Sequence, residues 1–280
     1  MAYDFNFGSK TAKGGFASER EVVKKFKNWK NDKEAQEWLR IMGYPLEKIQ
    51  DLKVFHIPTK LNKEKKVFFG LEKDEDIEFK KADVQVRLLI KIDNIYKVEN
   101  ISIKKISSGD YNQVDKRKVD NYKKIWGFDD DIAISLKLFT GEILPCDFDN
   151  YDGFVNIPCD KLRDKRRIFL NELKEDKLEK IIKFFNCNKH LIVADVLRGR
   201  GALSANWLMV LKYNKKEDIT DWALVEINIV VNIYCKGEVS LTKEGSLKIG
   251  QVVMQRKGGT PDPDKLQFKI KPSLLLHKYE

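Results

Sequence analysis

Two segments rich in β-branched residues stand on either side of a polar turn, and this pattern limits the fold more than any other. They are residues 84–92 (VQVRLLIKI) and residues 101–106 (ISIKKI), with Asp93-Asn94 at the turn. Runs of this length and composition are typical of strands, and short polar pairs are typical of tight turns. The pattern therefore predicts an antiparallel hairpin.

Polar residues of this hairpin are expected to gather at one end. Side chains alternate along a strand, so Ser102 and Lys104 lie on one face while Ile101 and Ile103 lie on the other. Asp83 begins the first strand, and folding the hairpin at its turn brings this residue close to Ser102 and Lys104.

The residue types in this cluster suit phosphodiester hydrolysis. That reaction needs a hard cation held by oxygen ligands, which the Asp83 carboxylate can supply, and positive charge at the scissile phosphate. Lys104 can provide the charge and orient or deprotonate the attacking water. Ser102 offers no carboxylate, so another acid has to complete a metal site. The same residues are also compatible with a surface hairpin that carries one exposed lysine.

Glu19 is the candidate for that acid. Residues 18–29 are predicted to form a helix, in which Ser18 and Glu21 make a capping box. Glu19 lies three residues before Val22, on the apolar face that points inward. The alternative is a half-exposed acid that is favoured in the first turn by the helix dipole.

The charge balance favours a polyanionic partner. The chain has 53 lysines and arginines against 43 aspartates and glutamates, which gives a formal net charge of +10. A positive surplus of this kind suits nucleic acid. A lysine-rich genome that places lysine on every exposed face would give the same balance.

Composition also excludes some classes of protein. Hydrophobic residues make up 42% of the chain, as in globular proteins, and no apolar run reaches the roughly 18 residues that a membrane-spanning helix needs. Because the N-terminal residues do not read as a secretory signal, we expect a cytoplasmic protein without a membrane partner. We also expect the four widely spaced cysteines, Cys146, Cys159, Cys187 and Cys235, to be reduced.

Periodicity and turn residues predict the remaining elements. Helices are expected at residues 32–42, 114–126 and 165–185. Strands are expected at residues 191–196, 206–212, 238–241, 251–256 and 266–270. Residues 222–234 are compatible with helix or strand, and residues 258–264 are expected to form a loop. This order predicts an α/β (α+β) fold with a mixed central sheet flanked by helices, in a single domain over residues 1–280.

Other nuclease and nucleotide-binding signatures are missing from the sequence. The three histidines, His56, His190 and His277, are too few and too scattered for a metal-dependent nuclease with a histidine base. No GxxxxGK[ST] phosphate-binding loop occurs. The hairpin cluster is therefore the main candidate for chemistry.

This cluster resembles the PD-(D/E)xK nuclease signature, with Ala82 in the position of the proline and Ser102 in that of the second acid. Further blocks keep their order over nearly the whole chain and resemble type II restriction endonucleases of the HinP-one-I family, which cut GCGC. These blocks include Gly8-Ser9-Lys10-Thr11-Ala12-Lys13, Trp38-Leu39, Tyr111-Asn112-Gln113-Val114-Asp115-Lys116, Asp164-Lys165-Arg166-Arg167, Leu197-Arg198-Gly199-Arg200-Gly201 and Gln255-Arg256-Lys257-Gly258-Gly259.

The resemblance implies a PD-(D/E)xK core, Mg²⁺-dependent hydrolysis of double-stranded DNA at a short specific site, and 5′-phosphate ends. It implies catalytic roles for Asp83 and Lys104 and carries the family's helical acid over to Glu19. Ser102 stands where the family has a glutamine, so this chain departs from the family there. The metal would be held by Asp83, Glu19 and the backbone carbonyl of Ile103.

DNA contacts are expected beside the catalytic hairpin (residues 83–106), in loops at residues 107–118, 197–204 and 254–268. The resemblance implies that Tyr111 wedges into the base stack. Arginine and lysine suit guanine, glutamine suits adenine, and many basic contacts go to phosphates. The predicted DNA-binding residues are Lys10, Tyr111, Asn112, Gln113, Lys116, Arg198, Arg200, Gln255, Arg256, Lys257 and Gln267.

Two other functions remain open. A sequence-tolerant repair or recombination nuclease would use the same cluster, and a non-catalytic DNA-binding protein would explain the missing acid at Ser102. The restriction enzyme implies a DNA methyltransferase in the same cell, because an unprotected genome would be cut. It could act as a monomer or a homodimer.

Overall fold

The computed structural model describes residues 19–58, 84–106, 111–213, 219–256 and 264–278. The chain divides into two compact units. Unit 1 comprises Met1–Asn112, Arg198–Val230 and Pro272–Glu280, and unit 2 comprises Gln113–Leu197 and Val231–Lys271. The single endonuclease domain expected over residues 1–280 stays a prediction.

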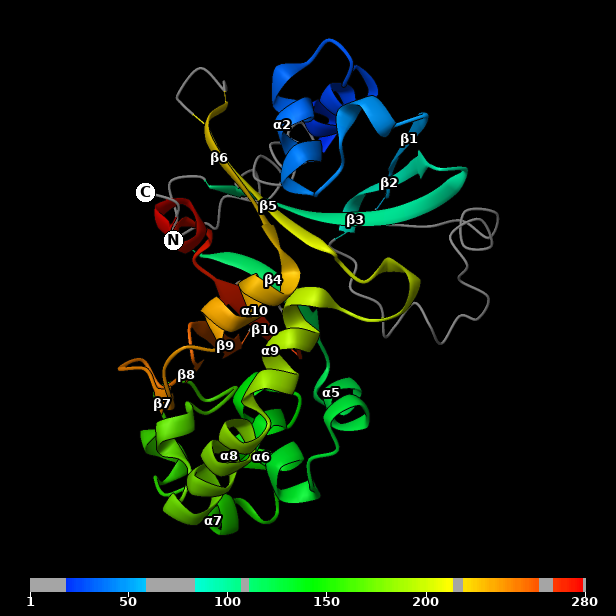
Figure 1. Ribbon diagram of the computed structural model, residues 1–280. Helices are drawn as coiled ribbons and strands as arrows, with labels where there is room; N and C mark the ends of the chain where they lie inside the picture. The colour runs from blue at the N-terminus through cyan, green and yellow to red at the C-terminus, as the bar shows by residue number, and fades with distance from the viewer. Residues whose placement is uncertain (1–18, 59–83, 107–110, 214–218, 257–263, 279–280) are drawn as a thin grey trace. The chain divides into compact units, whose positions relative to one another are not determined.

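Unit 1 is built on a mixed sheet, as predicted. Its strands are β1 (Asp51–His56), β2 (Val84–Ile92), β3 (Ile95–Ile106), β5 (Trp207–Tyr213) and β6 (Ile219–Glu226), and they lie side by side in the order β1-β2-β3-β5-β6 (Figure 1). β3 and β5 run parallel, and the other neighbours are antiparallel. The mixed sheet and its flanking helices confirm the α+β fold class.

The predicted hairpin is present as β2 and β3. Asp93 and Asn94 both have positive φ angles, 51° and 63°, as the two central residues of a type I′ turn require, and Ile92 pairs with Ile95. β3 begins at Ile95, six residues before the predicted start at residue 101. The strand is longer than expected because this turn is tight enough to continue the pairing up to its ends.

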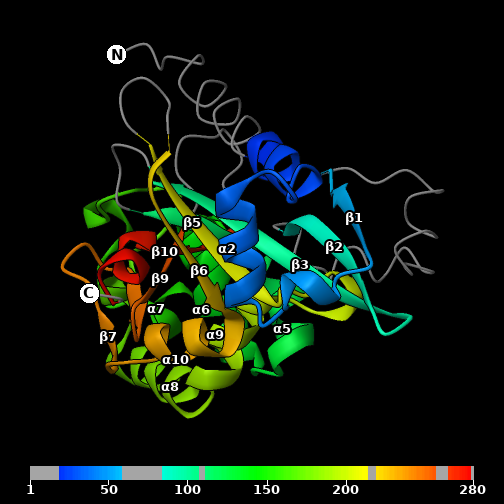
Figure 2. The ribbon, with the colours of Figure 1, turned by 45° about the horizontal axis from the view of Figure 1, so that its top comes forward.

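Helices cover one face of the unit 1 sheet. A helix at residues 19–27 and α2 (Lys33–Ile41) confirm two predicted helices, and Figure 2 shows α2 crossing the sheet. The carboxylate of Asp32 accepts a hydrogen bond from the Ala35 amide at 3.0 Å and caps α2. Phe26 and Trp38 pack with Ile101 and Ile103 in one buried cluster. Short 3₁₀ helices lie at η1 (Leu46–Lys48), η5 (Gly201–Leu203) and η6 (Pro272–Lys278).

Unit 2 combines a second sheet with several helices. The sheet order is β4-β10-β9-β8-β7, with β4 at Asn112–Arg117, β7 at Val239–Leu241, β8 at Leu247–Ile249, β9 at Val252–Arg256 and β10 at Leu266–Ile270. The helices that contribute to it are α5 (Val119–Trp126), α6 (Asp130–Thr140), α7 (Tyr151–Phe154), α8 (Glu175–Cys187), α9 (Lys189–Arg198) and α10 (Ile227–Tyr234), with 3₁₀ turns η2 (Pro145–Asp147), η3 (Cys159–Lys161) and η4 (Leu170–Glu172). No helix in the described ranges is long and apolar enough to cross a membrane.

Strands β5, β7, β9 and β10 confirm the predictions at residues 206–212, 238–241, 251–256 and 266–270. The helix predicted at residues 114–126 is wrong in its first part, which is β4. In β4, Asp115 and Arg117 are both buried and form an ion pair at 3.1 Å. The helix starts only at Val119.

Two further predictions are wrong and one ambiguity is resolved. Residues 165–174 form no α-helix and contain only the 3₁₀ turn η4, and α8 starts at Glu175. Residues 191–196 belong to α9 and not to a strand. The prediction failed because the periodicity of a short apolar run does not distinguish a helix from a strand. Residues 222–234 divide into β6 and α10, and the Glu226 carboxylate accepts hydrogen bonds from the amides of Asn228 and Ile229 at the start of the helix.

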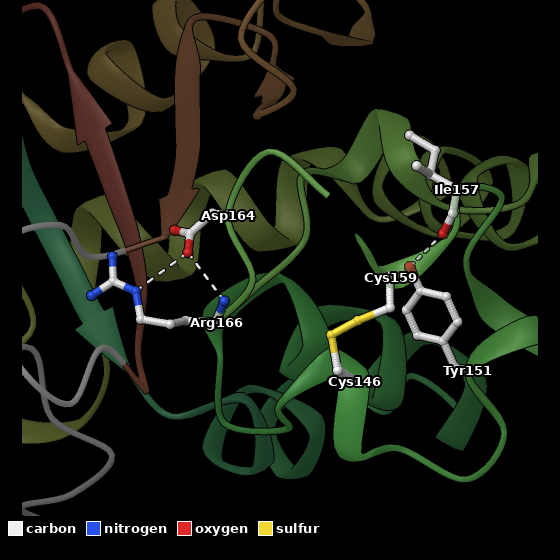
Figure 3. Close-up of a disulfide and its surroundings, with 6 residues drawn as sticks. All are labelled: Cys146, Tyr151, Ile157, Cys159, Asp164 and Arg166. Atoms are coloured by element: carbon white, nitrogen blue, oxygen red, sulfur yellow. Dashed lines mark hydrogen bonds and ion pairs between the residues drawn. A yellow bond between two sulfur atoms is a disulfide. The ribbon is translucent and has the colours of Figure 1, made fainter. Parts of the chain in front are cut away.

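The expectation of four reduced cysteines is wrong for one pair. Cys146 and Cys159 form a disulfide with their Cα atoms 5.7 Å apart, and Figure 3 shows Tyr151 beside it with its hydroxyl donating to the Ile157 carbonyl. Cys187 and Cys235 are free. Spacing did not indicate the bond because the intervening chain folds back through η2, α7 and η3.

The turn conformation predicts the effect of a substitution. Asn94→Val should destabilise the protein by about 1–2 kcal/mol, because a β-branched residue tolerates a left-handed backbone poorly. Asn94→Gly is the matched control and should leave stability unchanged or raise it. Urea unfolding followed by circular dichroism measures both, and equal stability of the two variants would contradict the assigned turn.

Candidate active site

The centre of the predicted site lies on β3, a strand with neighbours on both sides. Ser102 pairs with Val84 of β2 and with Leu208 of β5, and Lys104 pairs with Val210. Ser102 is fully buried and Lys104 is 7% exposed. The alternative that Lys104 is an exposed lysine on a surface hairpin is therefore wrong, although the hairpin is exposed near its turn. Asp83, which directly precedes Val84 in the sequence, lies outside the described residues.

Gln85 fixes the backbone between the two site residues of β3. The register of β2 and β3 shifts between Val84 and Val86, which leaves Gln85 in a bulge. Its side-chain Oε1 accepts the amide hydrogen of Ile103 at 2.7 Å, and its carbonyl accepts that of Ile57 at 2.8 Å. Sequence reasoning missed this residue, because a glutamine within a strand gives no signal of a bulge.

The Ser102 hydroxyl is a buried polar group whose hydrogen-bonding capacity the described residues leave unsatisfied. Its oxygen is buried and has no hydrogen-bond partner among the described residues. A buried hydroxyl that lacks a partner is costly, and its position beside a buried lysine suits a polar or anionic ligand. This chemistry fits a phosphate or a hydrated metal ion. Within the described ranges, no three histidine, cysteine, aspartate or glutamate residues gather into a metal-binding group.

Glu19 is held by β1. Its Oε2 lies 2.9 Å from Nε2 of His56, and its side chain is 13% exposed. His56 pairs with Val86, so Glu19 lies at the end of the sheet where β2 begins. The helix of Glu19 packs on the Ile101 side of the sheet. The structure thus brings Glu19 to the predicted end of the sheet, but not onto the face of Ser102 and Lys104.

Several predicted DNA-binding residues of unit 1 are exposed. Tyr111 is 46% exposed, and Arg198 and Arg200 are exposed at the end of α9 and in the loop that follows it. Asn112 donates a hydrogen bond to the Lys105 carbonyl at 3.2 Å, which ties it to the end of β3. Lys10 lies outside the described residues.

The predicted residues of unit 2 lie on its sheet. Gln113 and Gln267 are joined by a side-chain hydrogen bond of 2.6 Å, and Lys116 and Gln255 are half-buried. Lys257 lies outside the described residues. Arg256 ends β9.

Arg256 belongs to a packed arginine cluster. Its guanidinium stacks on Phe169 at 3.8 Å from the ring centroid, donates to the carbonyls of Arg167 and Ile168, and lies 3.7 Å from Asp164. Burial, together with the nearby Arg167, lowers the pKa of Arg256 to about 10. These contacts hold the Arg256 guanidinium in place within unit 2.

Asp164 is the acid at the centre of this cluster. Burial alone would raise the pKa of its carboxyl, but hydrogen bonds from the Arg166 amide and from the Arg167 and Arg166 guanidinium groups outweigh burial and lower it. Figure 3 shows the two hydrogen bonds from Arg166 to Asp164. The carboxylate therefore stays charged and holds the arginines in place.

The fold is that of a restriction endonuclease. It matches the crystal structure of restriction endonuclease MspI in complex with its cognate DNA at a TM-score of 0.54 and 11% sequence identity, over 88% of this chain and 83% of that one. Residues 42–276 match the R.HinP1I restriction endonuclease family, and the chain belongs to that family. It is thus a site-specific deoxyribonuclease. A comparison with curated protein sequences finds no match.

The bulge predicts how Gln85 responds to substitution. Gln85→Leu should destabilise the protein by about 1–3 kcal/mol, because the Ile103 amide loses its acceptor. Gln85→Glu keeps an acceptor oxygen and should retain most of the stability. Urea unfolding measures both variants, and a leucine variant as stable as the wild type would show that another group satisfies this amide.

The arginine cluster predicts a pH-dependent contribution to stability. Asp164→Asn should lower the free energy of unfolding by roughly 1–3 kcal/mol at pH 7. Because the folded pKa of Asp164 is lowered, this difference should shrink as the pH falls below about 4 and the wild-type carboxylate becomes protonated. Unfolding at pH 7 and pH 3.5 measures it. A difference that does not depend on pH would contradict the assigned charge.

Proposed function

We propose that this enzyme is a Mg²⁺-dependent type II restriction endonuclease that cuts double-stranded DNA at a GC-rich site of about four base pairs and leaves 5′-phosphate ends. The observation that carries the proposal is the buried Ser102-Ile103-Lys104 segment, with Val84, the neighbour of Asp83, paired opposite Ser102. Family membership supports restriction activity, and the finer features rest on the chemistry of these residues.

Each residue of the site has a proposed task. Asp83, Glu19 and the Ile103 carbonyl would hold Mg²⁺ at the end of the sheet where β2 begins, which Glu19 reaches from the face opposite to Lys104. The ion would supply Lewis acidity at the scissile phosphate. Lys104, enclosed in the sheet, would orient the attacking water and neutralise charge that develops on the phosphate. The Ser102 hydroxyl, which lacks a protein partner in the described ranges, would donate a hydrogen bond to that water or accept one from it.

DNA recognition is proposed for both units. Arg198 and Arg200 are the first candidates for base contacts, because both are exposed and the loop between them carries glycine. The ring of Tyr111, which is exposed, would wedge into the base stack. Gln113, Lys116 and the remaining predicted residues would position the DNA or read its edges.

The cellular setting follows from the activity. A DNA methyltransferase in the same cell would protect the host sites, and the enzyme would act in the cytoplasm, where DNA is accessible, as a monomer or a homodimer. The MspI structure contains cognate DNA, which makes double-stranded DNA the proposed partner here.

Lys104→Ala should abolish cleavage but leave specific binding. Purified wild-type protein with Mg²⁺ should cut unmethylated phage DNA into discrete bands, and chelation of the metal should stop it. Lys105→Ala is the matched control, because Lys105 is the next residue in the strand but its Nζ lies over the Tyr213 ring, 4.2 Å from the centroid. This variant should still give the bands.

Each other outcome of the digest has a meaning. A smear in place of bands would indicate a sequence-tolerant nuclease. No cleavage at any Mg²⁺ concentration would favour a non-catalytic DNA-binding protein, which the lack of a carboxylate at Ser102 would explain. Loss of both cleavage and specific binding in a folded Lys104→Ala variant would contradict the catalytic role of Lys104.

Glu19→Gln should raise the Mg²⁺ concentration for half-maximal cleavage about tenfold, because one negative ligand is lost. His56→Gln is the control, since it changes the partner of Glu19 and keeps the carboxylate. Initial rates against Mg²⁺ concentration measure both variants. An unchanged Mg²⁺ dependence together with lower thermal stability in Glu19→Gln would assign Glu19 a structural role alone.

A further inference from the structure

The loop after α9 is fixed by residues of the catalytic hairpin. The side-chain amide of Asn100 on β3 donates hydrogen bonds to the carbonyls of Ala202, at 3.1 Å, and Ser204, at 2.8 Å. Its oxygen accepts from Nε of Arg87 on β2 at 2.9 Å. Asn100 is 4% exposed, so its two donor hydrogens and its acceptor are used inside the protein.

Further hydrogen bonds join the same two segments. Nη2 of Arg87 donates to the Ala202 carbonyl. The backbone amide of Asn100 donates to the side-chain oxygen of Asn206 at 2.9 Å, and the Asn206 amide donates to the Asn100 carbonyl at 2.9 Å. Leu203, in the middle of the loop, is 4% exposed and anchors it by burial. Residues 202–206 are thus held on several sides.

These hydrogen bonds fix the backbone of the turn that carries Arg198 and Arg200. Gly199 and Gly201 have φ angles of 73° and 69°, which other residues rarely adopt, and the Ala205 amide donates to the Arg198 carbonyl at 2.7 Å. Arg198 and Arg200 are exposed on the resulting turn.

The same strand also carries the proposed catalytic residues. Arg87 pairs directly with Asn100, which precedes Ser102 by two residues and therefore shares its face of β3. The loop between α9 and β5 belongs to the same unit as β3. A shift of Asn100 would consequently affect both the loop and the segment with Lys104.

We propose that Asn100 and Arg87 are positioning residues for sequence recognition: they hold the loop at residues 198–204 in its DNA-reading shape and link it to the strand that carries Ser102 and Lys104. The inference rests on the proposed function, because it requires that this loop reads DNA. Base discrimination depends on side-chain placement, so a loop released from Asn100 would distinguish sites less well.

Near-isosteric variants test this link. Asn100→Asp keeps the acceptor for Arg87 but turns a carboxylate oxygen toward the carbonyls of Ala202 and Ser204, which should release the loop. Arg87→Lys keeps the charge but cannot reproduce both guanidinium contacts. Asn206→Asp is the matched control, because it makes the same chemical change nearby and retains the oxygen that accepts from Asn100.

Two measurements are made on each full-length variant. The first is the ratio of kcat/KM on a short duplex with the site found in the phage digest to kcat/KM on duplexes with one base pair changed. It should fall about tenfold in Asn100→Asp and Arg87→Lys and stay within about twofold in Asn206→Asp. The second is amide hydrogen exchange of residues 199–205, which should become faster in the first two variants.

The outcomes separate this inference from the proposed function. Failure of wild-type protein to give discrete bands would refute the proposed function and, with it, the recognition role. If the wild type cuts at discrete sites, faster loop exchange with unchanged discrimination would overturn the inference alone. Unchanged exchange would show that the loop does not depend on Asn100. If Asn100→Asp does not fold, Arg87→Lys decides by the same two measurements.

Discussion

The site in unit 1 depends on the backbone pairing of β3 with strands on both sides. The antiparallel partner β2 brings Val84 opposite Ser102, and the parallel partner β5 encloses Ser102 and Lys104. This double pairing takes a lysine and a serine out of water, a placement that burial alone would disfavour. A charge in such a position suits stabilisation of a phosphate, since a water-excluding site strengthens electrostatic interactions.

Local sequence signals predicted the part of the fold that they encode directly. The hairpin and the strand at residues 266–270 follow from β-branched runs and alternation, and α2 follows from helical periodicity. Where the sequence misled, tertiary contacts had changed the meaning of a residue. Residues 114–117 were predicted as the start of a helix, but they form β4, in which Asp115 and Arg117 make a buried ion pair. Residues 191–196 of α9 are mostly apolar and form a short run, which fits strand and helix equally.

The sequence likewise predicted only those residues of the candidate site that a local pattern indicates. Residue types and spacing indicated Ser102 and Lys104, and the structure buries both. Gln85 and Asn100 could not be found in this way, because their roles come from hydrogen bonds to chain segments that are distant in sequence or across the sheet. The sequence pattern around a single glutamine or asparagine does not indicate which distant backbone groups its amide will bind. The pairing of Glu19 with His56 likewise joins a helix to a strand that no local pattern connects.

The parallel pairing of β3 with β5 also affects how the nascent chain folds during synthesis. Ile101 pairs with Trp207, roughly a hundred residues later, so a growing chain has synthesised the whole first segment of unit 2 before β3 receives its second neighbour. Until then the strand with Lys104 is an open edge. A chain that ends before β5 therefore leaves Ser102 and Lys104 on a strand with one open edge, and the pairing that encloses them can form only after residues 207–213 have been synthesised.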